Sequence, residues 1–321
     1  MSADPREAYA SGTALPDVVP GAGAAAPGAG APIQQANLWR DAWRRYLQNK
    51  GAVIAGGVFV AFVLFCLIWP IVSPYDIRND PLNFSEAYEK PSLEHPLGTD
   101  KLGKDMLTKL ALGGRISIAI GVGATLMILF FGVVYGSIAG FAGGVLDNIQ
   151  MRLLDALYGL PYLPFAIIVL AIIGENNIWT MVIALSIASW FTAARIVRGQ
   201  IITLKENDYV RAAKAVGARW YRVLTRHLLP NTLGVLIIAI FLELPGVILG
   251  EAFLSFIGLG ISPPDASLGS MAQEGREVYR VHPYVIAIPS IAIAMLVLCA
   301  NFIADGVRDA LDPRTRETKE H

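Results

Sequence analysis

Long apolar runs alternate with short polar segments along most of this chain. A membrane-spanning helix needs about 20 mainly apolar residues, because the bilayer core holds no water to satisfy an exposed backbone. The runs of suitable length and composition are 51–72, 115–141, 153–173, 178–198, 231–256 and 285–307. The pattern therefore predicts an all-α polytopic membrane protein with six transmembrane helices.

The segments outside these runs predict the rest of the organisation. Residues 1–37 are rich in Ala, Gly and Pro and indicate a disordered tail. Residues 38–50 place Trp39, Trp43 and Leu47 on one face of a helix and cations on the rest, which is typical of an interfacial amphipathic helix. The remaining segments are then a loop at 73–114, a core of five further spans at 115–308 and a C-terminal tail at 309–321.

Basic flanks predict how the chain is oriented in the membrane. Cytoplasmic flanks carry an excess of Lys and Arg, and the helix 38–50 before the first run is basic. An even number of spans returns the C-terminus to the same side, together with the basic segment 205–230 between the fourth and fifth runs. The loop 73–114 also carries five cations and is the exception. We expect both termini in the cytoplasm and this loop to be extracytoplasmic.

The composition agrees with a membrane protein and argues against several other classes. Of the 321 residues, 54% are apolar and 16% are charged, and the mean hydropathy is +0.51, whereas soluble domains carry about 25% charged residues. The net charge of zero gives no support for nucleic-acid binding. Cys66 and Cys299 both lie inside apolar runs and the histidines are scattered, so neither a disulfide nor a metal site is predicted.

One polar segment, at about 205–230, separates the apolar runs of the C-terminal half. Ala212 and Ala213 allow another backbone to come close, and Gly217 falls where a first short helix would end in a left-handed turn. A second short helix is expected to end before Pro230, which cannot continue a helix from inside. The segment thus predicts a helix–turn–helix wedge. Its expected apolar contacts are Val216, Val223, Leu224 and Leu228.

The spacing within this wedge resembles the EAA loop of permease subunits of ABC importers: Ala-Ala, three residues, Gly, nine residues, and then His-Leu-Leu-Pro. Arg211 stands where that family usually has Glu, and His227 stands where it usually has Ile; both differences occur in the peptide-permease branch. A basic, solvated loop at a membrane surface would explain the charge but not this spacing. The residues that the resemblance implies for coupling to an ATPase are Arg211, Ala212, Ala213, Gly217, His227, Leu229 and Pro230.

Three more blocks, at 95–105, 251–260 and 305–313, resemble the peptide/nickel permease family. With the basic helix at the start, the resemblance spans about 38–316, and it is strongest to the C-type permease of dipeptide and oligopeptide importers. It implies the type I ABC importer permease fold, with cytoplasmic coupling helices between spans four and five. The implied function is translocation of di- or oligopeptides, and nickel chelates, glutathione or other small solutes remain alternatives.

Two of these blocks supply candidates for an outer gate or for docking an external protein. The first block has the Gly and capping residues of a tight turn with charges free for a partner, although a loop that folds on its own permease is an equal alternative. The second places an acid at the outer end of the fifth span, with Ser255 able to satisfy backbone freed by a turn; a structural role is its alternative. The candidates are Thr99, Asp100, Asp105, Glu251, Ser255, Gly258 and Gly260.

Glu243 is the one ionisable residue near the middle of a predicted span. A carboxylate at that depth is costly, so we expect Glu243 to face the translocation path or a partner rather than lipid. A neutral, hydrogen-bonded structural glutamate is the alternative.

Glycine and proline predict further features of the spans. Gly132, Gly136 and Gly140 recur at every fourth position and predict a bare helix face on which a neighbouring helix packs closely. Pro161 and Pro164 interrupt the third run and are expected to kink it.

The chain carries no G-x-x-x-x-G-K-[ST] motif, the phosphate cradle of an ATPase. We therefore expect a transport subunit that is not itself an enzyme and binds no cofactor, with ATP and Mg bound by partner subunits. The resemblance implies two ABC ATPase subunits, a homologous second permease, an extracytoplasmic peptide-binding protein and a surrounding lipid bilayer. An ion-coupled secondary transporter would show repeats and paired ionisable residues inside spans, and an intramembrane enzyme would show a metal or nucleophile cluster.

Overall fold

The computed structural model describes residues 38–79 and 81–311. The predicted tail 1–37 and residues 312–321 of the predicted C-terminal tail lie outside the described residues. Within the described part, the regular secondary structure is helical apart from one isolated β-bridge between Thr99 and Asp105. The all-α fold class is confirmed.

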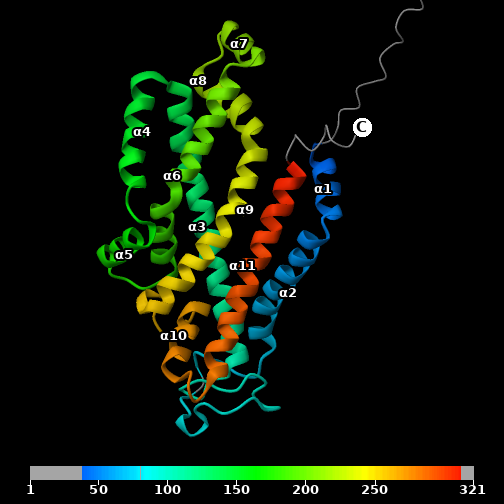
Figure 1. Cartoon of the computed structure of the whole chain (residues 1–321), viewed down its shortest axis with the longest axis vertical. Coiled ribbons are helices and arrows are strands. Elements are labelled where there is room, and N and C mark those ends of the chain that lie inside the picture. Colours follow the sequence, from blue (N-terminus) through cyan, green and yellow to red (C-terminus); the bar gives the residue numbers. More distant parts are fainter. Residues whose placement is uncertain (1–37, 80, 312–321) are drawn as a thin grey trace, which may run out of the picture. The chain divides into compact units, whose positions relative to one another are not determined.

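The helices follow one another with short connections except for the loop after α2 (Figure 1). Two π-helical turns, Leu224–Leu228 and Ser255–Leu259, flank α9. The helices are α1 (Leu38–Gln48), α2 (Lys50–Val72), α3 (Met106–Ala142), α4 (Gly144–Tyr158), α5 (Tyr162–Ile173), α6 (Ile178–Lys205), α7 (Asp208–Ala215), α8 (Trp220–Val223), α9 (Leu229–Leu254), α10 (Leu268–Val278) and α11 (Pro283–Leu311), with a 3₁₀ turn at Phe84–Glu86.

Among the described residues, five helices are long and apolar enough to cross a membrane. A sixth is reached only if α4 and α5 count together, because the pair is bent by 92° at a break. The predicted kink in the run 153–173 is thus a complete break between Tyr158 and Tyr162. Pro161 lies in this break, has no N–H to continue a helix, and disfavours helical backbone at the residue before it.

Three other predicted boundaries shift. The predicted loop 73–114 is shorter, because α3 begins at Met106, where the Asp105 carboxylate accepts a hydrogen bond from the Thr108 N–H at 2.8 Å. The amphipathic helix predicted at 38–50 is confirmed as α1 but ends at Gln48, with Trp39, Trp43 and Leu47 exposed. At the other end, α11 runs to Leu311, inside the predicted tail 309–321.

Close packing of α3 on α6 is the largest helix contact of the described chain. It is made possible by the predicted glycine face. A Cβ on Gly140 would lie 2.8 Å from the Arg198 carbonyl oxygen, and one on Gly132 would lie 2.5 Å from the Ala193 side chain. Because these glycines lack a Cβ, the two backbones approach directly, which confirms the prediction.

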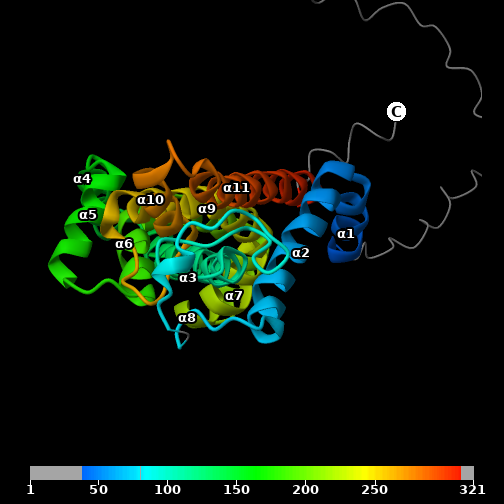
Figure 2. The same cartoon turned by 90° about the horizontal axis from the view of Figure 1, so that it is seen from below.

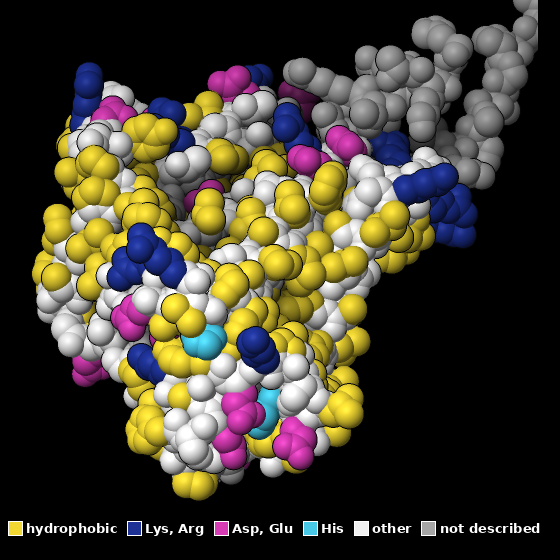
Figure 3. Space-filling model, turned by 60° about the horizontal axis from the view of Figure 1, so that its bottom comes forward, with side chains coloured by type: hydrophobic (Ala, Val, Ile, Leu, Met, Phe, Trp, Pro, Cys, Tyr) yellow, Lys and Arg dark blue, Asp and Glu magenta, His cyan; other side chains and the backbone are white. Residues whose placement is uncertain are grey.

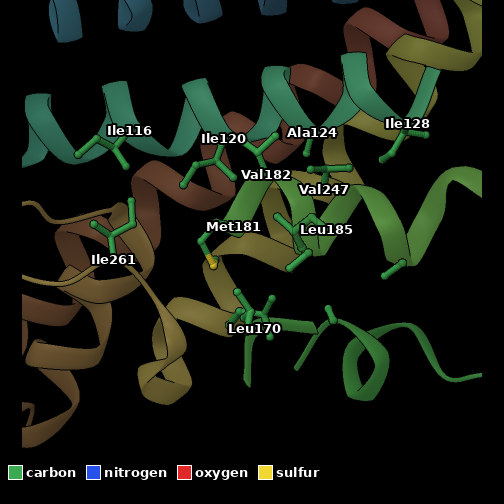
Figure 4. Packing of buried hydrophobic residues seen from close by; sticks show 14 residues of the cluster. Ile116, Ile120, Ala124, Ile128, Leu170, Met181, Val182, Leu185, Val247 and Ile261 are labelled. Atoms are coloured by element: carbon green, nitrogen blue, oxygen red, sulfur yellow. The ribbon is translucent and has the colours of Figure 1, made fainter. Parts of the chain in front are cut away.

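The central core lies between α3, α5, α6 and α9 (Figure 4). Side chains of α3 spaced four residues apart face α6, as the 3.6-residue period of a helix requires. Hydrophobic side chains cover the flanks of the molecule, while charged and histidine side chains gather at the end formed by the loop after α2 and by α10 (Figure 3). The buried residues labelled in the core are Ile116, Ile120, Ala124, Ile128, Leu170, Met181, Val182, Leu185, Val247 and Ile261.

The arrangement of helices gives the bundle two distinct ends. Seen from below, α1 and α2 lie at one edge and α4 and α5 at the opposite edge (Figure 2). The wedge helices α7 and α8 lie at the same end as α1 and the last turns of α11, and the loop 73–105 lies at the other end (Figure 1).

Candidate functional site

The first arm of the wedge is α7, and Gly217 fixes its end. Gly217 has φ +79°, and its N–H donates to the Lys214 carbonyl oxygen at 3.0 Å. The Ala218 N–H donates to the Ala213 carbonyl oxygen, also at 3.0 Å. These two bonds make a Schellman cap, which favours glycine at the left-handed position. The predicted turn at Gly217 is confirmed.

The second arm does not end before Pro230, which corrects the prediction. Instead, α8, the π-helical turn Leu224–Leu228 and α9 continue one into the next without a break, as part of the 40-residue span Trp220–Leu259. The Leu229 N–H bonds to the Leu224 carbonyl oxygen, five residues back, so the backbone is wider here than in an α-helix. Such a turn accommodates a proline that has no N–H to donate. The second arm is therefore continuous with a membrane-spanning helix.

The wedge has one side packed on the bundle and one side exposed. Val223, Leu224 and Leu228 are buried against α6 and α9, as predicted. Val216 is 85% exposed, which corrects its assignment as an apolar contact, and Trp220 beyond the turn is 61% exposed. Of the predicted coupling residues, Arg211, Ala212, Gly217 and Pro230 are exposed, and Ala213, His227 and Leu229 are half-buried.

Phe141, at the end of α3, ties the wedge to the bundle, and the sequence did not indicate this contact. Lys205 Nζ donates to the Phe141 carbonyl oxygen at 2.7 Å and lies 5.7 Å from the ring centroid. Lys214 Nζ lies 5.3 Å from the same ring, and the Trp220 ring lies 6.3 Å away. Since cations are attracted to an aromatic face within about 6 Å, Phe141 contacts both arms of the wedge.

Two arginines of α6 hold α4 alongside it. Arg198 donates to both Asp147 carboxylate oxygens, at 2.5 and 2.7 Å. Arg195 donates to Asp155 at 2.8 Å and lies 4.4 Å over the Tyr158 ring. Bidentate Arg–carboxylate pairs are among the stronger polar contacts, so α4 stays packed on α6 up to the break that follows it.

At the other end of the bundle, the acids of the loop are paired inside the chain. Thr99, Asp100 and Asp105 are no more than 2% exposed. The Asp100 carboxylate accepts from Lys109 Nζ at 2.5 Å, and Lys109 also reaches Glu274 of α10 at 2.7 Å. A cation between two carboxylates therefore joins the loop, α3 and α10.

The other two loop candidates are similarly engaged. Asp105 caps α3 and lies 3.1 Å from His95 Nδ1. Thr99 Oγ1 donates to the Glu86 carbonyl oxygen and accepts from the Glu89 N–H at 2.8 Å. These side chains are not exposed to an external protein, which corrects the docking interpretation for them and supports the alternative, a loop that folds on its own chain.

A cavity of about 540 Å³ beside this loop was not foreseen. The exposed Arg115 of α3 lines it, together with Asp76 and an ion pair of 2.6 Å between Arg78 and Asp265. Hydrogen bonds from the Asn79 side chain and from the backbone N–H groups of Arg78 and Asn79 hold the pKa of Asp76 below its usual value. The cavity is polar and carries charges of both signs.

The block 251–260 folds back at Gly258, whose φ of +95° confirms the predicted turn. Glu251 is completely buried, and its Oε1 accepts from Ser255 Oγ at 2.7 Å. The Ser255 hydroxyl therefore bonds to the Glu251 side chain. It had been expected to bond to backbone freed by the turn. A Cβ on Gly260 would lie 2.6 Å from Ser255 Oγ, so the glycine permits this close turn. Glu251 is not accessible to a docking partner; a role in gating stays a prediction.

Glu243 lies on α9 and lines a cavity of about 540 Å³ with residues of α6 and of the break between α4 and α5. The Glu243 side chain is half-buried, with protein on one side and the open cavity on the other. Glu243 therefore lines a cavity, and its facing the translocation path or a partner stays a prediction. The second arm of the wedge, Glu243 and Glu251 lie apart along the segment Trp220–Leu259.

Comparison with known protein families gives two matches in this chain. Residues 132–317 match the family described as "Binding-protein-dependent transport system inner membrane component". Residues 37–91 match "N-terminal TM domain of oligopeptide transport permease C". The first match covers the wedge, Glu243 and Glu251, and the second covers α1, α2 and the start of the loop.

Several curated proteins are similar over most of their length. The dipeptide transport system permease protein DppC of Bacillus subtilis (strain 168) is 41% identical over 280 residues, which are 86% of this chain and 86% of that protein. The oligopeptide transport system permease protein OppC of the same strain is 39% identical, over 88% of this chain and 91% of that protein. The glutathione transport system permease protein GsiD of Pectobacterium atrosepticum is 37% identical, over 87% of this chain and 92% of that protein.

Proposed function

This chain belongs to the family of binding-protein-dependent transport system inner membrane components, and from this premise we propose that it carries dipeptides or oligopeptides through the cytoplasmic membrane as the C-type permease of an ATP-driven importer. The relatives named for dipeptide and oligopeptide transport support the substrate class. The match to the N-terminal domain of permease C supports the subunit type.

The exposed wedge is the observation that carries the proposal. An apolar tip, Val216 and Trp220, stands out from a basic surface formed by Arg211, Arg219 and Arg222. Exposed apolar side chains rimmed by polar ones are typical of protein interfaces. Because the arm behind the tip is continuous with a spanning helix, movement of a docked partner would act directly on the membrane bundle.

The partners follow from this account. Two ABC ATPase subunits bind ATP and Mg and dock on the wedges of this chain and of a homologous second permease, and an extracytoplasmic binding protein delivers the peptide. This chain itself binds no nucleotide. Both termini are proposed to lie in the cytoplasm with the wedge, in keeping with the position of α1 and the last turns of α11 at the wedge end of the bundle.

Cross-linking from the wedge tip tests the docking directly. Both native thiols, Cys66 and Cys299, are buried, so Val216→Cys adds an accessible thiol for a photoreactive maleimide. We expect irradiation of the assembled transporter to join this chain to the ATPase. Leu93→Cys, at a position 103% exposed in the loop of the other end, is the matched control and is expected to give no such product. A product from Leu93→Cys alone would reverse the proposed orientation, and none from Val216→Cys would contradict docking at the wedge.

Glutathione is the alternative substrate that one relative supports. Competition separates the two: excess glutathione should leave peptide uptake unchanged if the chain serves peptides. Uptake of labelled glutathione by the same transporter, with no uptake of labelled peptide, would favour the alternative.

A further inference from the structure

The cavity beside Glu243 exists because the third span is broken. Tyr158, Leu160 and Tyr162, which flank the 92° bend between α4 and α5, form one wall. α6 and α9 form the others. Non-helical backbone at membrane depth is tolerated only where it is buried in protein or lines a water-filled space. The break and the cavity therefore belong together, and the cavity brings several polar side chains to the side of an otherwise apolar bundle.

The polar groups of this cavity are specific in kind. Among the described residues, Glu243 is the only charged side chain that lines it, and Ser189 and Thr192 of α6 contribute hydroxyls. Arg195, three residues after Thr192 on α6, is paired with Asp155 at 2.8 Å. The site thus offers one carboxyl and several hydroxyl groups without a competing cation on its wall.

Two of these groups lack partners within the described chain. No hydrogen bond or ion pair with a described residue engages the Glu243 carboxyl, and the buried Tyr162 hydroxyl makes no hydrogen bond. Polar groups taken out of water without a partner are costly. The Glu243 carboxyl lines the open cavity and is suited to receive a donor from outside the chain, whereas the Tyr162 hydroxyl oxygen is enclosed by the chain itself.

The size and opening of the cavity favour a small ligand. Its volume of about 540 Å³ falls within the roughly 300–1,000 Å³ of ligand sites. Tyr158, Leu160, Thr192 and Gly246 on its rim are exposed, so the cavity opens at the surface of the chain. A metal ion is a poor match, since the lining supplies a single carboxyl and no His or Cys.

We propose that this cavity is a transient subsite for the α-ammonium group of a peptide in passage, with Glu243 as the counter-ion and the hydroxyls of Ser189 and Thr192 beside it. The proposal rests on the proposed function, because the ligand is the transported peptide. A permease that accepts many peptide sequences has to use groups that all peptides share, and the N-terminal ammonium is the one such group that is cationic. A charge-assisted hydrogen bond to a carboxylate is the strong form of that contact.

The test uses the complete transporter, reconstituted with its ATPases, second permease and binding protein. Glu243→Gln keeps the shape and removes the charge, and it should lower the rate of peptide uptake about tenfold, the change expected for loss of one charge-assisted hydrogen bond. Glu243→Asp should retain part of the activity. Glu277→Gln, at an exposed carboxyl of α10, is the matched control and should transport as the unaltered protein does.

A direct readout separates a substrate site from a structural carboxyl. A carbodiimide joins a carboxylate to a bound primary amine as an amide, itself taking up the water that is released. Treated during turnover, the transporter should yield a fragment in which Glu243 is linked to the peptide N-terminus, and an N-acetylated peptide should give none. Should Glu243→Gln fail to reach the membrane, Thr192→Val, which removes an exposed hydroxyl of the cavity, provides the second variant and should slow uptake of the same peptide.

The outcomes are distinct. The subsite is overturned if Glu243→Gln takes up peptide within about twofold of the unaltered transporter. Loss of one such hydrogen bond would cause a larger decrease. The absence of an amide at Glu243 in a transporter that takes up the peptide also overturns the subsite. If the unaltered transporter takes up no peptide at all, the proposed function fails, and the subsite fails with it.

Discussion

Replacing Gly217 by valine strains the wedge turn without touching a spanning helix. At φ +79° an L-residue costs roughly 1–2 kcal/mol, and a β-branched one costs more. A Cβ at Gly217 meets no atom within 4 Å, so the backbone conformation is the whole cost. Relaxing to negative φ would instead break both cap hydrogen bonds, from Gly217 to Lys214 and from Ala218 to Ala213, at about 0.5–1.5 kcal/mol each.

Both the strained turn and the broken cap change the angle between the two arms of the wedge. The wedge meets its partner through these arms. A change of about 1.4 kcal/mol corresponds to a tenfold change in binding, so we expect ATPase association at least about tenfold weaker. The membrane level of the permease should be normal, because insertion depends on the apolarity of the spans. The assay measures membrane level, co-purified ATPase and peptide uptake in one strain.

Two matched variants make the result specific to the turn. Asparagine tolerates positive φ better than other non-glycine residues, so Gly217→Asn should keep most of the coupling. Gly57→Val, in α2, adds the same side chain into open space without a positive φ and should leave all three measurements unchanged. The reasoning is refuted if Gly217→Val binds the ATPase and supports uptake as well as Gly217→Asn does.

Two further substitutions test the packing of the bundle and of its loop. Gly136→Leu pushes a side chain against the backbone of Ala194 on α6 and should destabilise the detergent-solubilised protein by about 1–3 kcal/mol, measured as a lower Tm. An unchanged Tm would contradict close packing of α3 on α6. Lys109→Met leaves buried Asp100 without its cation and should lower the stability of the protein by about 3–5 kcal/mol, so that protease cuts the loop 73–105 more readily. Equal resistance of the loop to protease would show that the ion pair does not hold it.

Features set by neighbours in the sequence could be predicted. The turn at Gly217 was predictable because a Schellman cap is made by residues within one helix end. The glycine face at Gly132 and Gly140 was predictable because a helix repeats every 3.6 residues, although its partner α6 was not. The spans were predictable from the length of the apolar runs. Such a run indicates the part of a helix that crosses the lipid but not where the helix begins, so the start of α3 at Met106 was missed.

Features that depend on distant residues could not be predicted. The local rule for proline failed at Pro230, because a π-helical turn before it lets the helix continue. Asp100 looked available for docking because its partner Lys109 becomes close only once α3 forms and α10 packs on it. The need of Glu243 for a polar environment was foreseen, but the cavity that meets it requires the break of the third span.

On the proposed function, this chain moves peptides only with the ATPase docked on its wedge. The most direct measurement is accumulation of a labelled peptide in proteoliposomes, with the complete transporter or with this chain alone. We expect accumulation that requires ATP hydrolysis, binding protein and ATPase, and that persists when the proton gradient is collapsed. Uptake by this chain alone, driven by a proton gradient without ATPase, would contradict it.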